Sequence, residues 1–204
     1  VTPADADAAV DAARPGRFAQ GAVGAGTGMT AFGFKAGIGT SSRLMQIEGE
    51  DFTLGALVLA NFGPVGQLVL PDGRRPVPDR DSETEKGSVI VVLATDLPLG
   101  DRQLQRVARR AGAGLARLGA FWGNGSGDLA VCFTTADPVE HQPQSAFAPL
   151  RRLDDARIDL AFRAAAEATQ EAVLNALCEA PATQGRDGRF YPSLADWLKE
   201  NPLR

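Results

Sequence analysis

Three short apolar runs constrain the fold of this chain more than any other feature, because each has the length of a single β-strand. They lie within residues 52–60, 89–94 and 128–134. The first run stops abruptly at Asn61, and Ser88 stands directly before the second, at the border with a charged loop. The sequence therefore predicts buried strands with polar side chains at their ends.

Longer segments have the periodicity of amphipathic helices. With Asp101 as N-cap, apolar residues recur at helical spacing as far as Leu115, and five arginines lie mostly on the opposite face. The longest helix is expected over residues 155–178, and a short last helix over residues 194–200, capped by Ser193. Helices beside paired strands predict an α/β protein whose sheets are covered by helices.

Two connecting stretches are rich in glycine or in charge. Residues 21–43 combine a glycine cluster with short alternation, which predicts two antiparallel strands in a hairpin and a turn that starts at Lys35. The glycines lack the G-x-G-x-x-G spacing, so close strand packing explains them better than a dinucleotide site. Residues 71–87 hold three prolines and nine charged residues without an apolar period, and they predict an exposed loop.

Composition and charge exclude several classes of partner. The formal net charge is -4, so no global positive field is present to hold nucleic acid or an anionic membrane. The arginines of the helix from Asp101 are expected to form a solvated or inter-subunit face. No apolar run approaches the roughly 20 residues of a membrane-spanning helix. Cys132 and Cys178 show no ligand spacing, so neither a disulfide framework nor a zinc site is indicated.

The Gly87-Ser88 pair has the features that a self-cleaving nucleophile requires. Glycine adds no Cβ that would obstruct attack by the Ser88 hydroxyl on the preceding carbonyl, and it tolerates strained dihedrals. Cleavage would leave Ser88 as a new N-terminus. Its own α-amine could then act as the base for the hydroxyl, so no histidine is required. By itself, however, a Gly-Ser pair before a strand is also an ordinary turn.

Four segments in order along the chain carry a specific resemblance. They are GAVGAGTGMTAFGFKAGIGTSSR, LVLANFG, KGSVIVVLATDLPLGDRQLQRVARRAGAGLARLG and NGSGDLAVCFTTA, and they extend from Gly21 to about Ala136. Together they resemble the L-aminopeptidase/D-amidase-D-esterase and β-peptidyl aminopeptidase family. Members of that family are N-terminal-nucleophile serine hydrolases that mature by autoproteolysis.

The resemblance implies a role for each matching residue. Ser88 corresponds to the nucleophile, and Gly87-Ser88 to the bond that is cut. Ser126 and Asp128 correspond to the pair that supports the nucleophile, although some members have Glu in place of this Asp. Asn61 corresponds to the donor to the oxyanion, a role in which a neutral amide is worth about 3–4 kcal/mol of barrier.

The implied architecture is a four-layer α-β-β-α sandwich of two stacked mixed sheets, with residues 1–204 forming part of a single domain. The resemblance implies no metal or organic cofactor. Residues 1–87 would be the tail of the larger subunit and residues 88–204 the smaller one. The N-terminal part of the family domain has no counterpart here, so a missing segment or companion chain is expected. Processed heterodimers would assemble into a homo-oligomer. The scarcity of lysine is typical of proteins encoded by GC-rich bacterial genomes. The sequence leaves open whether the protein lies in the cytoplasm or in the periplasm.

The implied function is removal of N-terminal residues from short peptides, or hydrolysis of amino-acid amides and esters, through an acyl-enzyme on Ser88. Alternatives are an amide hydrolase or acyltransferase of the nylon-oligomer or ornithine type, and a non-catalytic subunit. A Ser-His-Asp triad could use only His141, the single histidine, which lies in a proline-flanked loop. Without the resemblance, Ser126-Gly-Asp128 would be a turn before a strand.

Overall fold

A four-stranded mixed sheet lies at the centre of the computed structural model, which describes residues 1–79, 87–143, 145–186 and 188–203. Its strands, in spatial order, are β3 (Ile38–Ile47), β4 (Glu50–Asn61), β5 (Ser88–Thr95) and β6 (Leu129–Thr134). Adjacent strands are antiparallel except for the parallel pair β5 and β6. The three strands that the apolar runs predict are confirmed.

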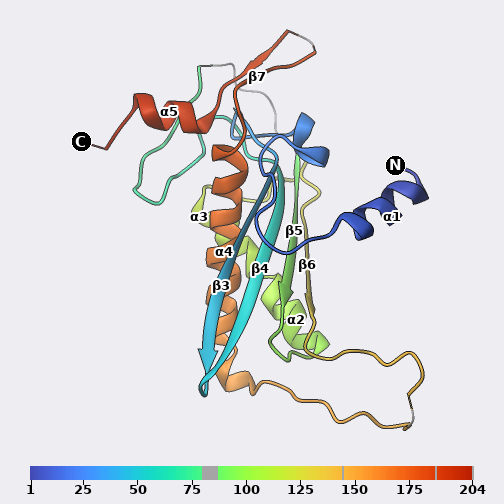
Figure 1. Cartoon of the computed structure of the whole chain (residues 1–204). Helices are drawn as coiled ribbons and strands as arrows, with labels where there is room; N and C mark the ends of the chain where they lie inside the picture. The colour runs from blue at the N-terminus through green and yellow to red at the C-terminus, as the bar shows by residue number, and fades with distance from the viewer. Residues whose placement is uncertain (80–86, 144, 187, 204) are drawn as a thin grey trace.

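One face of the sheet is covered by helices, namely α4 (Asp159–Cys178), α2 (Asp101–Ala108) and α3 (Ala111–Arg117) (Figure 1). Most of the buried residues of α4 are alanines, which allow the helix to approach the strands closely. At Gly39 of β3, an added Cβ would lie 1.9 Å from the carbonyl oxygen of Ala172. Small residues on both elements therefore set the separation between helix and sheet.

The helices differ in detail from the predicted ones. The helix expected from Asp101 is two helices with a break at Arg109 and Arg110, and its N-cap is Gly100 rather than Asp101. At Gly114 of α3, an added Cβ would lie 2.4 Å from a backbone oxygen of α4, so the break allows α3 to pack against α4. The long helix is preceded by a separate 3-10 turn, η2 (Asp155–Arg157).

The predicted hairpin is confirmed, but its turn lies earlier than expected. The 3-10 turn η1 (Gly24–Gly28) leads into β1 (Thr30–Ala31) and its antiparallel partner β2 (Phe34–Lys35). Phe32 and Gly33 form the turn, with φ of 53° and 86°. Positive φ at both central residues is the type I′ geometry that matches strand twist. The stretch after Lys35 runs into β3 instead of turning.

The remaining elements lie at the two ends of the chain. They are α1 (Pro3–Ala12), β7 (Thr183–Gln184), β8 (Phe190–Tyr191) and α5 (Leu194–Glu200), the last beginning after Ser193 as predicted. No helix in the described part of the chain is long and apolar enough to cross a membrane. Residues 80–86 of the predicted charged loop lie outside the described residues.

The face of the sheet opposite the helices is apolar and open among the described residues. Ile38, Leu59, Ile90 and Leu129 stand in one row across the four strands. Leu129 is 53% exposed, and Phe133 in the same strand is 48% exposed. The described residues thus provide one mixed sheet and its helical layer, and they contain no second sheet stacked on this face.

Candidate active site

Asn61 and Ser88 are brought together by the pairing of two strands. β4 ends at Asn61 and β5 begins at Ser88, and the two residues are direct register partners. Because the strands are antiparallel, the end of one lies beside the start of the other. The two predicted site residues, 27 positions apart in sequence, therefore meet at one edge of the sheet.

The loop before β6 brings Ser126 and Asp128 to the same edge. β6 runs parallel to β5, so the two strands begin at the same end of the sheet. Asp128 Oδ1 accepts the Val89 backbone N–H at 3.0 Å and the Ser126 hydroxyl at 2.6 Å. One carboxylate oxygen thus holds both the residue after Ser88 and the side chain of Ser126.

The Ser88 hydroxyl lies between two backbone groups. It donates to the Gly87 carbonyl oxygen at 2.8 Å and accepts the Gly127 N–H at 3.0 Å. A backbone N–H directed at this oxygen stabilises negative charge that develops on it. The hydrogen bonds of the described residues include none between Ser88 and Ser126. The segment Ser126–Asp128 contacts Ser88 through its backbone instead.

Gly87 is a position that only glycine can occupy in this geometry. An added Cβ would lie 1.9 Å from the Asn61 carbonyl oxygen and 3.2 Å from Phe62 Cα. Both atoms belong to backbone, so neither can move without disturbing the end of β4. The absence of a side chain before Ser88 is thus a packing requirement of the strand pair.

The Asn61 carboxamide is oriented from a segment that the sequence analysis did not assign to the site. The Thr30 N–H donates to Asn61 Oδ1 at 3.3 Å. Among the described residues, Asn61 Nδ2 has no hydrogen-bond partner, so this donor is available to a developing anion. Phe32 fixes the hairpin of Thr30 against the residues that directly follow β4, since its N–H donates to the carbonyls of Phe62 and Gly63. The ring of Phe32 also packs edge-on against Phe62.

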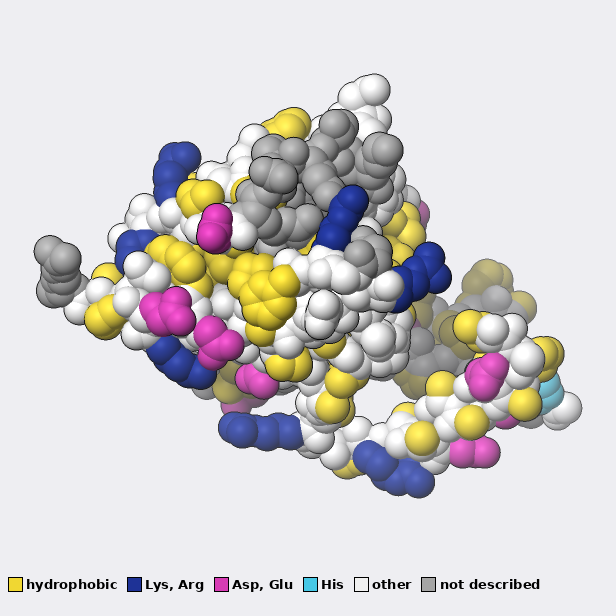
Figure 2. Space-filling model, turned by 90° about the horizontal axis from the view of Figure 1, so that it is seen from above, with side chains coloured by type: hydrophobic (Ala, Val, Ile, Leu, Met, Phe, Trp, Pro, Cys, Tyr) yellow, Lys and Arg dark blue, Asp and Glu magenta, His cyan; other side chains and the backbone are white. Residues whose placement is uncertain are grey.

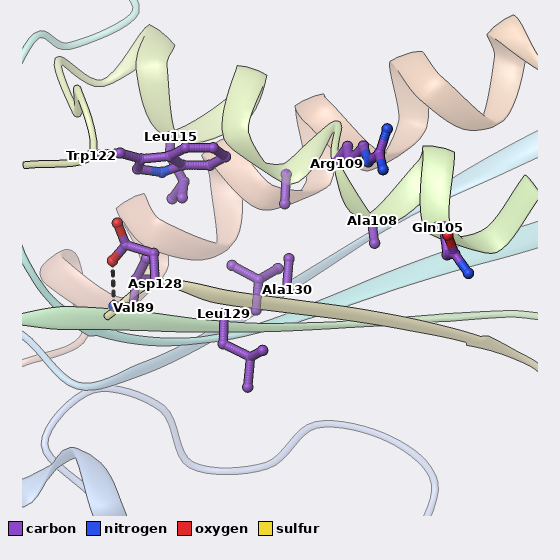
Figure 3. Close-up of a pocket in the computed structure, with 11 residues that line it drawn as sticks. Val89, Gln105, Ala108, Arg109, Leu115, Trp122, Asp128, Leu129 and Ala130 are labelled. Carbon is purple, nitrogen blue, oxygen red and sulfur yellow. Dashed lines mark hydrogen bonds between the residues drawn. The ribbon is translucent and has the colours of Figure 1, made fainter. Parts of the chain in front are cut away.

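A cavity of about 320 Å³ adjoins Asp128, between strands β5 and β6 and helices α2 and α3. Apolar side chains line it on both sides, with Val89 and Ala130 on the strands and Leu115 on α3. Figure 3 shows the Trp122 ring close to Asp128 at one end of the cavity, with Arg109 toward the other end. The carboxylate of Asp128 therefore has the hydrogen-bonded Val89 on one side and this space on the other.

Other candidate groups lie away from this site or have unsuitable chemistry. His141 follows the far end of β6, on an exposed loop that projects from the body (Figures 1 and 2), so the triad alternative is not assembled. Burial raises the pKa of the Cys132 thiol to about 11, which keeps it protonated near neutral pH. Within the described ranges, no cluster of His, Cys, Asp or Glu could hold a metal ion.

Comparison with known proteins relates the chain to one group of enzymes. The sequence model of peptidase family S58 matches residues 1–191. The β-peptidyl aminopeptidase BapA of Sphingosinicella microcystinivorans is 37% identical over 206 residues, which cover 92% of this chain and 52% of that protein. BapA of Sphingosinicella xenopeptidilytica is also 37% identical, over 87% of this chain and 48% of the relative. The chain thus spans about half the length of these curated relatives.

Solved structures agree with the sequence matches. A β-aminopeptidase of a Burkholderia species superposes with a TM-score of 0.83 at 34% identity, covering 100% of this chain and 60% of that one. The L-aminopeptidase D-Ala-esterase/amidase of Ochrobactrum anthropi, described as a new variant among the Ntn hydrolase fold, gives a TM-score of 0.79 at 36% identity. That match covers 98% of this chain and 58% of the enzyme.

Proposed function

The chain belongs to peptidase family S58, and from this membership and the contacts of Ser88 we propose that it carries the nucleophile of a self-processing aminopeptidase or amidase. The family resemblance and the Ntn-hydrolase-like α/β fold class that the sequence predicts are confirmed. The single observation that carries the proposal is the position of the Ser88 hydroxyl, hydrogen-bonded to the carbonyl oxygen of Gly87 and to the Gly127 N–H.

Maturation is proposed to begin with attack of Ser88 Oγ on the carbonyl carbon of Gly87. A C–O ester bond forms, the Gly87–Ser88 C–N bond breaks, and the Ser88 nitrogen takes up the hydroxyl proton. Water then hydrolyses the ester, releasing the Gly87 carboxylate and restoring the Ser88 hydroxyl. The proposal is supported by the hydrogen bond between the attacking hydroxyl and the scissile carbonyl group, and by the absence of a Cβ at Gly87.

In turnover, the freed α-amine of Ser88 is the proposed base. It accepts the Oγ proton as the hydroxyl attacks the substrate carbonyl, and it returns that proton to the leaving amine. Asn61 Nδ2 donates to the oxyanion of the tetrahedral intermediate. Asp128 holds the Val89 N–H and Ser126, and this fixes the backbone beside the new N-terminus. Water then releases the acyl group from Ser88.

The proposed substrates are short peptides, or amino-acid amides and esters, with a free N-terminal amine. This class is supported by the relatives, which are named β-peptidyl aminopeptidase and L-aminopeptidase D-Ala-esterase/amidase. An amide hydrolase or acyltransferase of the nylon-oligomer or ornithine type, expected from the sequence as an alternative, is not favoured by these names.

We propose further that the part of the relatives that this chain does not span packs on the open face of the sheet. The row of Ile38, Leu59, Ile90 and Leu129 is an apolar surface of the kind that proteins bury against a second layer. Residues 1–87 would then belong to the larger subunit and residues 88–204 to the smaller one. Processed heterodimers are proposed to associate into a homo-oligomer.

The self-processing proposal is tested by intact-mass measurement of variants at position 88. Ser88→Ala is expected to leave one uncut polypeptide, because no nucleophilic atom remains. Ser88→Cys and Ser88→Thr are expected to be cut, since each keeps such an atom on Cβ. Ser145→Ala, an exposed serine of the projecting loop, is the matched control and should be processed at the wild-type rate. Normal cleavage of Ser88→Ala would refute Ser88 as the self-processing nucleophile. An intact wild-type protein would favour the non-catalytic subunit instead.

A further inference from the structure

Lys35 is a buried lysine with an unusual set of partners. Its residue is only 2% exposed, and its ammonium group donates to three backbone carbonyls. These belong to Gly26 at 3.2 Å, Met29 at 2.7 Å and Ala36 at 2.7 Å. Three acceptors match the three N–H donors of a protonated ammonium group. Among the described residues, no carboxylate forms an ion pair with it.

One of these carbonyls belongs to the peptide group that holds Asn61. The Met29 C=O and the Thr30 N–H are the two ends of a single planar peptide unit. The oxygen end accepts from Lys35 Nζ, and also from the Ala36 N–H at 3.1 Å. The nitrogen end donates to Asn61 Oδ1 at 3.3 Å. A single peptide unit therefore connects the buried cation with the carboxamide of the proposed oxyanion donor.

We infer that Lys35 is a positioning residue for the oxyanion site, acting on Asn61 through the Met29–Thr30 peptide. The inference rests on the proposed function, which makes Asn61 Nδ2 the donor to the intermediate. Lys35 does not touch the substrate in this arrangement. It fixes the peptide whose N–H selects the orientation of the Asn61 side chain, with Oδ1 toward Thr30 and Nδ2 without a partner among the described residues.

The direction of the dipoles adds an electrostatic effect to this positioning. In a trans peptide, the C=O and N–H groups point in opposite directions, so a cation at the oxygen polarises the N–H as a donor. The carboxamide of Asn61 continues this series of groups, since its oxygen accepts and its nitrogen donates. A positive charge at Lys35 thus strengthens the donor end at Nδ2, where negative charge develops in the transition state.

The buried ammonium group of Lys35 is held by backbone carbonyls in place of water. Desolvation lowers the pKa of the Lys35 ammonium group, because a charge in the interior loses its contacts with water. Three carbonyl dipoles compensate for that loss. The same contacts join Gly26 of η1, its C-cap Met29 and Ala36, which directly follows β2, around one atom. They hold the two ends of the hairpin that contacts Asn61.

A double-mutant cycle tests whether Lys35 acts through Asn61. The variants are Lys35→Met, Asn61→Ala and the combination, measured in the purified protein with any companion portion that it carries. The readouts are the rate of cleavage at residues 87/88, and kcat and KM on an amino-acid p-nitroanilide. Removal of one oxyanion donor typically costs about 10²–10³ in kcat. We expect Lys35→Met to lower kcat by about tenfold or more, with a much smaller change in KM.

The decisive result is the effect of Lys35→Met in the Asn61→Ala background. If Lys35 acts through Asn61, the second substitution lowers the rate by less than about twofold there, because the donor is already absent. The same fold loss in both backgrounds would overturn the inference, since it would mean that Lys35 contributes to structure alone. A Lys35→Met protein with wild-type kcat would overturn it as well.

Controls separate this inference from folding and from the proposed function. Lys199→Met removes an exposed lysine that pairs with Asp196, and it should leave both rates unchanged. If Lys35→Met does not fold, as judged by thermal unfolding, Lys35→Gln replaces it in the cycle, because Gln is neutral yet keeps two N–H donors. If Asn61→Ala alone has no effect, the proposed oxyanion role itself fails. If the wild-type protein is active and Asn61→Ala slows it, but the effects of Lys35→Met and Asn61→Ala are additive, only the role of Lys35 is contradicted.

Discussion

At the scale of single residues, the site depends on backbone contacts more than on side chains. The Ser88 hydroxyl is hydrogen-bonded to the Gly87 carbonyl and the Gly127 N–H, while Asp128 holds the Val89 N–H. The sequence identified Ser88, Ser126, Asp128 and Asn61 through motifs of the family. It did not identify Thr30 or Lys35, because the Thr30 N–H and the Lys35 ammonium group find their partners only after folding. A lysine within an otherwise apolar stretch was the only available signal.

Gly87→Ala tests the packing requirement before the nucleophile. The new Cβ would lie 1.9 Å from the Asn61 carbonyl oxygen, and overpacking of this kind typically costs about 1–3 kcal/mol. We expect the strand pair to be displaced at this point and cleavage to slow by roughly tenfold or more, measured by intact mass over time. Gly28→Ala adds a Cβ with no atom within 4 Å and serves as the control. Equal cleavage rates for the two variants would contradict the requirement.

The pH profile of turnover identifies the base. An α-amine has an ordinary pKa of about 7.7–8.0, and only its neutral form can accept the Ser88 proton, so kcat should rise with pH through this pKa. A nearby carboxylate favours the ammonium form of an amine, so we expect Asp128→Asn to shift the rise to lower pH while also slowing the reaction. His141→Ala should leave the profile unchanged. A profile that Asp128→Asn does not shift, or that His141→Ala abolishes, would exclude the amine as base.

At the scale of elements, strand pairing accounts for how distant residues meet. The apolar runs predicted β4, β5 and β6 because buried strands have a clear length and composition. The break between α2 and α3 was not predicted, since Leu104 to Leu115 keep helical spacing across it. The cause is tertiary, namely the close approach of Gly114 to α4. Sequence periodicity therefore located the elements, whereas contacts between elements determined where one helix ends.

Gly39→Ala tests the contact between β3 and α4. The added Cβ would lie 1.9 Å from the Ala172 carbonyl oxygen and 2.4 Å from the Ala176 nitrogen, so helix and sheet would have to separate. We expect a loss of about 2 kcal/mol or more in the free energy of unfolding, measured by denaturant titration. Gly55→Ala on β4 is the matched control, since its nearest atom is 3.9 Å away. A Gly39→Ala protein as stable as the control would contradict the close packing.

At the scale of the whole molecule, the chain spans about half the length of its curated relatives. It provides a mixed sheet and its helical layer, and the opposite face of the sheet is apolar and exposed, with Leu129 and Phe133 among its residues. The four-layer sandwich follows from the family and not from the apolar runs, because the second sheet has no counterpart in the described residues. For the same reason, the substrate pocket could not be predicted from this sequence. Ser88 could be proposed as the nucleophile from the sequence, because β5 and the Gly87-Ser88 junction lie within the chain.

The most direct test of the central claim is to trap the acyl-enzyme and locate it. The mature protein is incubated with a slowly hydrolysed amino-acid ester, quenched in acid, digested and analysed by tandem mass spectrometry. If Ser88 is the nucleophile, we expect an added acyl mass on a peptide that begins with Ser88, with the acyl group on the side-chain oxygen and none on Ser126. An acyl group on Ser126 or any other residue, or hydrolysis of the ester by a protein in which Ser88 is still joined to Gly87, would contradict it.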